Sequence, residues 1–472
     1  MTTAVVVGSG PNGLAAAVTL ARAGVQVRVL EAAATIGGGT RTSELTLPGL
    51  LHDHCSAVHP MGVGSPFMRA ADLEKYGVTW RWPEVDLSHP LGEGRAGAMV
   101  WSLAETERLL GVDGRSWRRL FEPLSADFDD LAVDLMRPLV HLPRHPFKLA
   151  RFGLRALEPA AVVARRWSTP EARALFGGVA AHAFRPLHRP TSAAVGLMLI
   201  TVGHRYGWPV AEGGSRTITD ALARIVVEHG GVIETSSPVT DLRDVSADVV
   251  LLDLAPQGVI DIAGDRLPGR VRRAYAAYRH GPGAFKVDLA VDGGIPWRDE
   301  HSPRAGTVHL GGTFEEVAHA ELEVSRGRMP ERPFVLLGQQ YLADPTRSHG
   351  DQHPVWAYAH VPHGYPGDAT EQVIGQIERF APGVRERILD IKTTRATAWP
   401  AYNANFIGGD IATGANTERQ VAFRPRVTLR PYETGIPGVY ICSAATPPGG
   451  GVHGMGGSNA ANAALEALRR AG

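Results

Sequence analysis

Apolar and polar positions near the start of the chain predict a strand, a helix and a second strand. Residues 4–7 form a β-branched apolar run, and Leu14, Val18 and Ala21 follow at helical spacing. Gly24 then ends the helix, and residues 25–30 alternate apolar with polar side chains. This order of elements is typical of the first half of a nucleotide-binding parallel sheet.

Later apolar runs extend the same sheet. Residues 247–253 and 438–442 have the apolar character of buried parallel strands. A helical pattern follows residues 213–215, and another, rich in alanine and leucine, covers residues 458–470. Because the beginning, the middle and the end of the chain all contribute, the segments between them are expected to form a second, inserted domain.

Those intervening segments have a different pattern. Residues 103–203 are helix-like with proline breaks, whereas residues 285–289 alternate apolar with polar side chains. The predicted fold class is α/β: a Rossmann-like nucleotide-binding domain, with a parallel sheet flanked by helices, and an inserted α+β substrate domain of mixed sheet and helical cap. The expected bounds are 1–65, 205–280 and 395–472 for the nucleotide-binding domain, which the motifs below indicate to be FAD-binding, and 66–204 and 281–394 for the substrate-binding domain.

Three glycines between the first strand and the first helix fit a pyrophosphate-binding turn. Gly8 permits the turn, Gly10 lets main-chain N–H groups approach a pyrophosphate, and Gly13 allows the helix to pack closely on the strand. The helix start at Pro11 and Asn12 then faces the phosphates. Glu31 stands where an acid is expected to hydrogen-bond the ribose. NAD and FAD are both compatible with this unit alone.

The segment after Glu31 favours FAD. It continues as Gly37-Gly38-Gly39-Thr40-Arg41, and an acid followed by glycines and an arginine resembles the amine-oxidase and phytoene-desaturase group of flavoproteins. The resemblance implies that this loop lies along the FAD pyrophosphate, and that a strand around Val239 runs beside the adenine. Arg41 can place a cation beside a phosphate or the flavin edge.

A second glycine-rich loop near the other end of the chain completes the expected flavin site. It includes Gly450, Gly451, Val452 and Met455 and leads into the predicted C-terminal helix. A helix N-terminus there favours negative charge at the flavin N1/C2=O edge, and therefore hydride acceptance at N5. The loop resembles the C-terminal FAD signature of the phytoene desaturase-like branch. It departs from that signature at Cys442-Ser443, where many relatives carry Gly-Asp.

Two histidines are the candidate catalytic residues. His59 lies where relatives pass across the isoalloxazine, and His453 lies inside the C-terminal glycine loop. Either can act as a general base or acid, although a capped or surface role is the alternative for any histidine here. Asp53 is interpreted as structural. By family analogy, active-site walls are expected from His182, Trp399, Tyr402, Asn403 and Asn405, although a structural role is the favoured interpretation of His182.

Charge and composition narrow the partners. The 48 basic and 48 acidic residues cancel, which disfavours nucleic acid, and two cysteines, Cys55 and Cys442, exclude a cysteine-rich metal centre. We therefore expect no metal and a cytoplasmic location. Residues 137–167 hold seven Lys and Arg against Glu158 alone. They predict either peripheral membrane contact or a solvated cap broken by prolines.

Together these features predict an FAD-dependent oxidoreductase that removes hydride from a C–H or C–N bond of a largely apolar small molecule. Oxygen or a quinone is the expected electron acceptor, and the chain is expected to be a monomer or homodimer. A directly bound NAD(P)H is disfavoured, because no second dinucleotide fingerprint follows a strand. The open alternatives are a flavin-dependent double-bond isomerase, an amine oxidase, and a non-catalytic lipid- or prenyl-binding protein.

Overall fold

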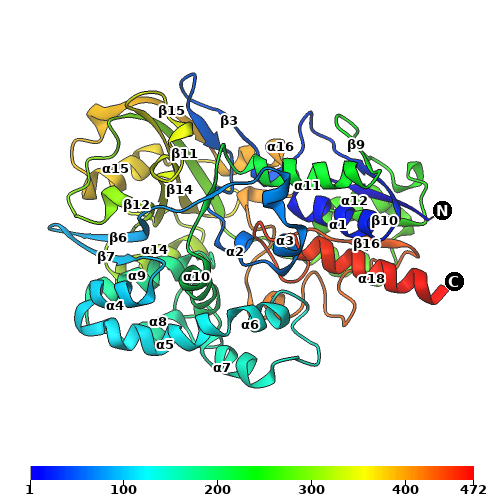
Figure 1. Ribbon diagram of the computed structural model, residues 1–472, viewed down its shortest axis with the longest axis horizontal. Helices are drawn as coiled ribbons and strands as arrows, with labels where there is room; N and C mark the ends of the chain where they lie inside the picture. The colour runs from blue at the N-terminus through cyan, green and yellow to red at the C-terminus, as the bar shows by residue number, and fades with distance from the viewer. Residues whose placement is uncertain (1, 472) are drawn as a thin grey trace.

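The computed structural model describes residues 2–471, and a parallel sheet holds its two chain ends together (Figure 1). The strand order is β9-β2-β1-β10-β16, and every neighbouring pair is parallel. The strands are β1 (Thr3–Val7), β2 (Gln26–Leu30), β9 (Val232–Glu234), β10 (Val249–Leu252) and β16 (Val439–Ile441). The strands predicted at residues 4–7, 25–30, 247–253 and 438–442 are therefore confirmed.

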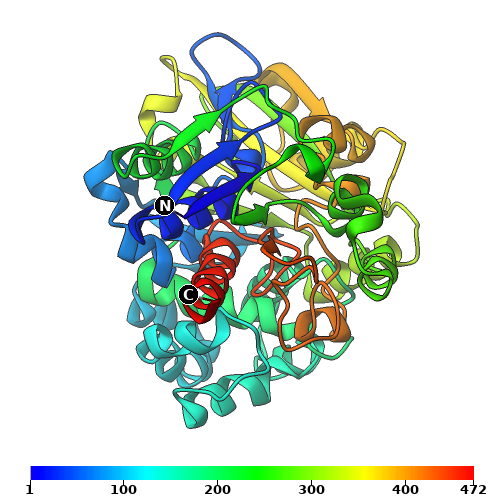
Figure 2. The same cartoon turned by 90° about the vertical axis from the view of Figure 1, so that its right-hand side faces the viewer.

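Helices cover both faces of this sheet because its strands are apolar on both sides. Ala4 and Val6 pack on one face with α1 (Pro11–Arg22), α11 (Arg216–Glu228) and α18 (Met455–Ala471). Val5 and Val7 pack on the other face with α12 (Pro256–Ala263) and α13 (Gly269–Ala276). Figure 2 shows the molecule from the side on which both chain ends lie, with α18 in red below the blue strands.

A second, mixed sheet has the order β15-β11-β14-β13-β12-β6-β7. Only β12 and β6 pair in parallel within it, and the other neighbours are antiparallel. Its strands are β6 (Val85–Gly92), β7 (Arg95–Met99), β11 (Gly283–Asp292), β12 (Ala305–Leu310), β13 (Val335–Gly338), β14 (Gln352–Val361) and β15 (Ile388–Thr394). Helices α14 (Phe314–Ser325) and α15 (Thr370–Phe380) pack against it.

The helical cap lies on the face of the mixed sheet that α14 also covers, because α14 packs against its helix α9, whereas α15 covers the opposite face (Figure 1). Prolines delimit its helices as predicted, because Pro146 and Pro170 occupy first helical positions and Pro159 precedes α8. The cap consists of α4 (Leu103–Leu109), α5 (Gly114–Ala126), α6 (Phe128–Leu135), α7 (Pro146–Ala156), α8 (Ala160–Ala164), α9 (Pro170–Ala181) and α10 (Ala193–Tyr206). No helix within residues 2–471 is long and apolar enough to cross a membrane.

Short elements connect these layers. They are β3 (Thr42–Glu44) with β4 (Leu51–Asp53), β5 (Trp80–Arg81) with β8 (Val210–Ala211), and helices α2 (Pro60–Val63), α3 (Pro66–Ala71), α16 (Trp399–Tyr402) and α17 (Glu418–Ala422). The strands of the parallel sheet fall in the segments predicted for the FAD-binding domain. Those of the mixed sheet fall in the segments predicted for the substrate-binding domain. The exact domain bounds stay a prediction.

One strand expectation is wrong. Val239 lies outside β9, which ends at Glu234. Ser236 adopts a left-handed φ of 51°, and the N–H of Ser237 donates to the carbonyl of Glu31 at 2.8 Å. The chain therefore turns across the end of β2 instead of continuing as a strand. A contact between Val239 and adenine stays a prediction.

Candidate functional site

The glycine turn after β1 has the geometry that close helix packing requires. Gly8 has a φ of 100°, and a Cβ on Gly13 would lie 2.2 Å from the carbonyl oxygen of Gly8. Pro11 begins α1, and the buried Asn12 accepts a hydrogen bond from Gly457 N at 3.4 Å. The turn therefore needs Gly13 for packing of α1 on β1, and Asn12 ties α1 to the C-terminal helix α18.

Glu31 holds the glycine turn from the end of β2. Its Oε2 accepts hydrogen bonds from the N–H and hydroxyl of Ser9, at 2.9 and 2.5 Å, and its Oε1 accepts from Ala33 N at 2.9 Å. The Arg41 guanidinium lies 3.5 Å from Oε1. Glu31, the predicted ribose-binding acid, therefore contacts both glycine segments. Its contact with a ribose stays a prediction.

The loop of residues 37–41 lies directly on the first glycine turn. Gly37 N donates to Ser9 O at 3.1 Å, and a Cβ on Gly38 would lie 3.0 Å from the Cα of Gly10. Thr40 is buried beside Thr219, with 3.2 Å between the two hydroxyl oxygens. Gly39 precedes Thr40, and a Cβ there would lie 3.2 Å from the Phe406 ring. Side chains at Gly38 and Gly39 would therefore separate these loops, which is the close backbone approach that a nucleotide cradle needs.

Arg41 is engaged within the same loops. Its Nη2 donates to Thr35 O at 2.8 Å, and its guanidinium lies 5.4 Å from the centre of the Tyr402 ring. The Tyr402 hydroxyl in turn donates to Gly38 O at 2.8 Å. Arg41 and Tyr402 therefore hold the second glycine loop in place.

The C-terminal loop meets the N-terminal segment at a cavity. Gly450, Gly451 and Val452 line it from one side and residues 55–62 from another. A Cβ on Gly62 would lie 3.2 Å from the carbonyl oxygen of Val452. The loop and residues 55–62, which are nearly four hundred positions apart in the sequence, therefore form one wall.

This cavity has a volume of about 330 Å³ and is mainly apolar. The rest of its apolar lining comes mainly from the mixed sheet and the cap, with Phe184, Leu199, Leu336, Trp356 and Tyr358, and Ile411 adds a side chain from the segment after α16. None of the described residues that line it is Asp, Glu, Lys or Arg. Such a pocket suits an uncharged, largely apolar ligand.

His59 lines this cavity in its neutral form. The Ser215 hydroxyl donates to Ser56 O at 2.7 Å, so it can only accept the hydrogen bond from His59 Nε2 at 2.8 Å. His59 Nε2 therefore carries the hydrogen, and Nδ1 keeps its lone pair. Burial lowers the pKa of His59 to about 4, although the charge of Asp53 opposes the shift. The ring is thus a neutral acceptor near pH 7.

His453 has a different position from His59. Its Nδ1 accepts the N–H of Met455 at 3.1 Å, which satisfies one of the free donors at the start of α18. Burial lowers the pKa of His453 to about 4, against the favourable effect of the Gly449 and Gly450 backbone. His453 is therefore a neutral residue with its hydrogen on Nε2. It caps α18 beside the cavity lining rather than within it.

The other side chains expected as walls divide into two groups. His182 does line the cavity, and its Nε2 lies 3.0 Å from Nε2 of His309. Trp399 is buried and donates to Ala284 O at 2.9 Å. Asn403 and Asn405 lie beside the glycine loops: a Cβ on Gly38 would lie 3.7 Å from Asn403 Nδ2, and Asn405 Nδ2 donates to Asp253 O at 2.9 Å. Trp399, Tyr402, Asn403 and Asn405 therefore support loops instead of forming the cavity wall.

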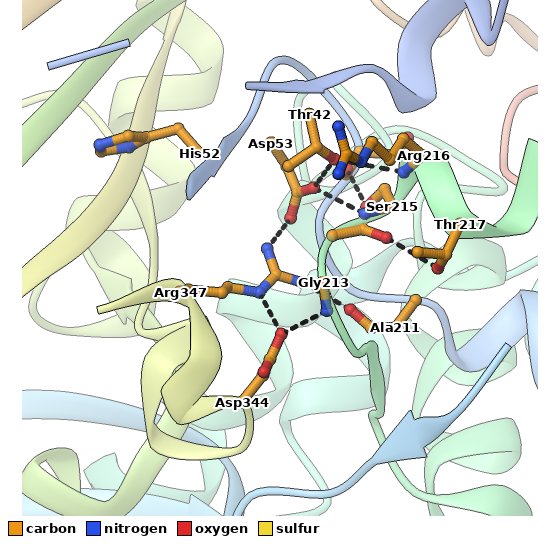
Figure 3. A network of polar contacts seen from close by, with 12 residues as sticks. Thr42, His52, Asp53, Ala211, Gly213, Ser215, Arg216, Thr217, Asp344 and Arg347 are labelled. Atoms are coloured by element: carbon orange, nitrogen blue, oxygen red, sulfur yellow. Dashed lines mark hydrogen bonds and ion pairs between the residues drawn. The ribbon is translucent and has the colours of Figure 1, made fainter. Parts of the chain in front are cut away.

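Asp53 has the structural role that the sequence indicated (Figure 3). It accepts hydrogen bonds from Thr42 Oγ1 at 2.7 Å and Ser215 N at 2.8 Å, and it pairs with Arg347 Nη1. Arg347 also donates to Asp344 at 2.9 Å. Burial alone would raise the pKa of Asp53, but the Arg347 charge and these hydrogen bonds keep it below its usual value. This network fixes Ser215 and, through it, His59.

Asp253 is a site residue that sequence reasoning missed. It follows β10, and its Oδ2 accepts Gly13 N at 3.0 Å; a Cβ on Gly10 would lie 2.7 Å from the same oxygen. Burial raises the pKa of Asp253 to about 6, and the nearby Glu31 charge contributes to the shift. An acid at the carboxyl end of a central parallel strand was a signal available in the sequence, because ligands of such sheets bind there.

Comparisons with known proteins agree with this architecture. A family model described as "NAD(P)-binding Rossmann-like domain" matches residues 6–72. A Rattus norvegicus protein named "Pyridine nucleotide-disulfide oxidoreductase domain-containing protein 2" is 25% identical over 563 aligned residues, which cover 99% of this chain and 94% of that protein.

Two solved structures are similar along the whole chain. An oxidoreductase from Methanosarcina mazei has a TM-score of 0.65 at 16% identity, covering 98% of this chain and 100% of the other. A putrescine oxidase bound to putrescine has a TM-score of 0.63 at 18% identity, covering 99% of each chain. The predicted fold class is confirmed: the chain is α/β, with a Rossmann-like parallel sheet and a separate mixed sheet, and its fold is similar to those of these two proteins.

Proposed function

We propose that this protein is an FAD-dependent oxidoreductase of the phytoene desaturase-like type, which removes hydride from a largely apolar small molecule. The observation that carries the proposal is the uncharged cavity between the C-terminal glycine loop and the mixed sheet. A hydride donor that enters it meets aromatic and aliphatic side chains and no described charged group. Apolar surface on the substrate is therefore the main source of binding free energy there.

The glycine segments fit FAD because their backbones approach their neighbours closely: a Cβ on Gly10 would lie 2.7 Å from Asp253 Oδ2, one on Gly13 2.2 Å from Gly8 O, and one on Gly38 3.0 Å from the Cα of Gly10. The first turn and the start of α1 would hold the pyrophosphate, with Glu31 on the ribose and the loop of residues 37–41 alongside. Gly450, Gly451, Val452 and Met455 would hold the isoalloxazine edge. Bound FAD would supply the hydride acceptor, with oxygen or a quinone reoxidising it.

His59 is the residue that we assign to proton transfer in this site. Its neutral ring would accept a substrate proton at Nδ1, while Ser215 fixes the orientation of the ring through Nε2. His453 would act instead as a hydrogen-bond donor through Nε2–H, because Met455 N already occupies its Nδ1. The buried Trp208 and the other apolar residues of the cavity exclude water from this region.

An amine oxidase is the second candidate, and one observation favours it. Trp356 and Tyr358 stand edge to face in the cavity, with ring centres 5.1 Å apart at 84°. Aromatic faces can bind an ammonium group without a carboxylate. The isomerase and the non-catalytic lipid-binding alternatives differ from both candidates, since neither removes electrons from a substrate.

The test begins with the visible spectrum of the purified protein and the chromophore that acid releases from it. Free FAD in near-stoichiometric amount is expected. Anaerobic mixing with apolar alkenes and alcohols, and separately with primary amines, should then show which class bleaches the flavin. A colourless protein that refuses added FAD would refute the proposal and favour the lipid-binding alternative. Product isomers formed without bleaching would favour the isomerase.

A pair of histidine variants tests the role of His59. We expect His59→Ala to retain FAD and to lower the rate of flavin reduction by about 10²-fold, the usual range for loss of a general base. His319→Ala is the matched control, because His319 is an exposed residue of α14. Equal reduction rates in both variants would remove His59 from the mechanism.

A further inference from the structure

The segment of residues 137–167, which contains α7, carries an unusual group of exposed apolar side chains. Leu142, Phe147, Leu154 and Leu157 are 93%, 88%, 70% and 64% exposed. Leu139, Val140 and Val162 of the same segment are exposed as well. Seven of the sixteen large exposed apolar residues described for this chain therefore lie within 24 consecutive positions. Isolated exposed apolar residues are ordinary, but a group of this kind marks an interaction surface.

Helix α7 presents two of these side chains, Phe147 and Leu154, on one face. Phe152 and Ala156 are buried on its inner side, whereas Phe147 and Leu154, two turns apart, point outward. In both overall views α7 lies at the lower edge of the molecule, far from the parallel sheet (Figures 1 and 2). Its inner side packs on α10, whose Leu199 lines the cavity. A single helix therefore separates the exposed apolar face from the apolar cavity.

The same segment is strongly basic. It has seven Lys and Arg and one Glu, a formal charge of +6, although the whole chain has a formal net charge of zero. Lys148 and Arg151 pair with Asp127, which precedes α6; Lys148 also pairs with Asp130 of α6, and Arg155 pairs with Glu158. Arg144, Arg165 and Arg166 have no carboxylate partner within 4.0 Å among the described residues. The surface thus combines free cations with protruding apolar side chains.

We propose that residues 137–167 dock this protein on a membrane surface that contains anionic lipids. Phe147, Leu154 and Leu157 enter the boundary between headgroups and acyl chains, and the free arginines contact lipid phosphates. Along the segment the exposed apolar side chains are interspersed with cations and do not form a continuous apolar surface. This mixture suits the headgroup region of a membrane better than the core of a protein–protein interface, where charged residues are depleted. The eleven residues of α7 lie flat in this interface. The docking does not depend on the proposed flavin chemistry.

Co-sedimentation of the full-length protein with vesicles tests this proposal. We expect binding to vesicles made of equal parts phosphatidylcholine and phosphatidylglycerol, and little binding to phosphatidylcholine alone. Raising the ionic strength to about 1 M should weaken binding, because it shortens the Debye length to about 3 Å. Equal binding to both kinds of vesicle, or binding that salt leaves unchanged, would overturn the proposal.

Two double variants separate lipid insertion from general surface effects. Phe147→Asp with Leu154→Asp should lower the partition coefficient on anionic vesicles by on the order of a hundredfold. The control, Val112→Asp with Leu429→Asp, changes two exposed apolar residues outside the segment and should bind normally. Retained binding by the α7 variant would refute the proposal. A concentration-dependent dimer that only this variant loses would assign the surface to a second copy of the chain instead.

Discussion

Asp253→Asn should stabilise the apo-protein at pH 8 and leave it unchanged near pH 4. The Asp253 carboxyl is buried at the end of β10 and accepts Gly13 N at 3.0 Å. Asparagine keeps an oxygen acceptor of the same size at this position and removes the charge. The expected stabilisation therefore measures the cost of ionising this carboxyl in the folded protein.

The magnitude follows from the pKa of Asp253. Burial raises it from an ordinary value of 3.8 to about 6. A raised carboxyl pKa means that the folded state binds the proton more tightly than the unfolded state. Stability is therefore lost as the pH rises from about 4 to about 6, and two pKa units correspond to about 3 kcal/mol. Above about pH 7 the difference from the variant should be constant at about 3 kcal/mol, because the pKa of about 6 already includes the hydrogen bond from Gly13 N to the carboxylate.

The assay is urea unfolding of apo wild type and variant at several pH values between 4 and 8. Asp248→Asn, in the same segment of the chain, is the matched control, and we expect it to change the free energy of unfolding in the opposite direction. Hydrogen bonds from Thr3 lower the pKa of Asp248, so its ionised form is favoured by folding. That variant should lose stability at pH 8. If Asp253→Asn were no more stable than wild type at pH 8, ionised Asp253 would not be costly.

The same carboxyl bears on cofactor affinity under the proposed function. A pyrophosphate at the start of α1 would bring further negative charge near Asp253, so binding should take up a proton there. The affinity of the wild-type protein for FAD should then fall between pH 6 and pH 8. Asp253→Asn should bind FAD with little pH dependence over this range, as fluorescence quenching of added FAD would show.

The remaining predictions concern the buried framework of the site. Arg347→Met should lower the free energy of unfolding by about 3 to 5 kcal/mol, because it leaves two buried carboxylates without their cation; a loss below 1 kcal/mol by urea titration would contradict this. His453→Ala should lower the stability by about 1 kcal/mol through loss of the α18 cap, whereas His453→Asn, which keeps an acceptor, should retain most of it in thermal melts. Gly13→Ala should abolish FAD retention, because its methyl group meets a backbone oxygen at 2.2 Å. Gly258→Ala, whose nearest contact lies at 3.4 Å, is the control and should retain FAD normally. The visible absorbance of the two purified variants measures the FAD that each retains.

The sequence predicted the parallel sheet well because local pattern and long-range structure agree there. Residues 4–7 and 247–253 are apolar on both faces, and helices cover both faces of the strands that they form. The polar alternation of residues 285–289 predicted β11 but not its surroundings. Lys286 and Asp288 are buried and pair with each other, and Asp288 also lies 3.3 Å from Nδ1 of His52 in β4. Alternation reports the two faces of a strand, and it cannot tell solvent from a buried ion pair.

The sequence predicted residues of the candidate site only in the glycine segments, where a local motif identifies them. The spacing of Gly8, Gly10 and Gly13 has a physical reason that is local to the turn. Arg347 and Asp53 are 294 positions apart, and no pattern links them before the chain folds. The cavity wall likewise comes from side chains of both domains, so its uncharged lining is a property of the tertiary structure.

Burial of the histidines sets the expected pH dependence of catalysis under the proposed function. It lowers the pKa values of His59 and His453 to about 4 and that of His182 to about 3. All three rings are then neutral above about pH 5, and none of them changes charge near neutrality. Asp253, with a pKa of about 6, is the group near the cofactor segments that does. The rate of anaerobic flavin reduction should therefore change between pH 6 and pH 8 in the wild type, because a bound pyrophosphate raises the pKa of Asp253 further, and stay level over this range in Asp253→Asn. A transition near pH 7 that persists in Asp253→Asn would point instead to Asp86, whose pKa burial raises to about 7 and which accepts the N–H of the cavity residue Trp208 at 3.1 Å. Its loss in Asp86→Asn would confirm that assignment, and its persistence there would mean that a histidine of the cavity titrates near its ordinary value.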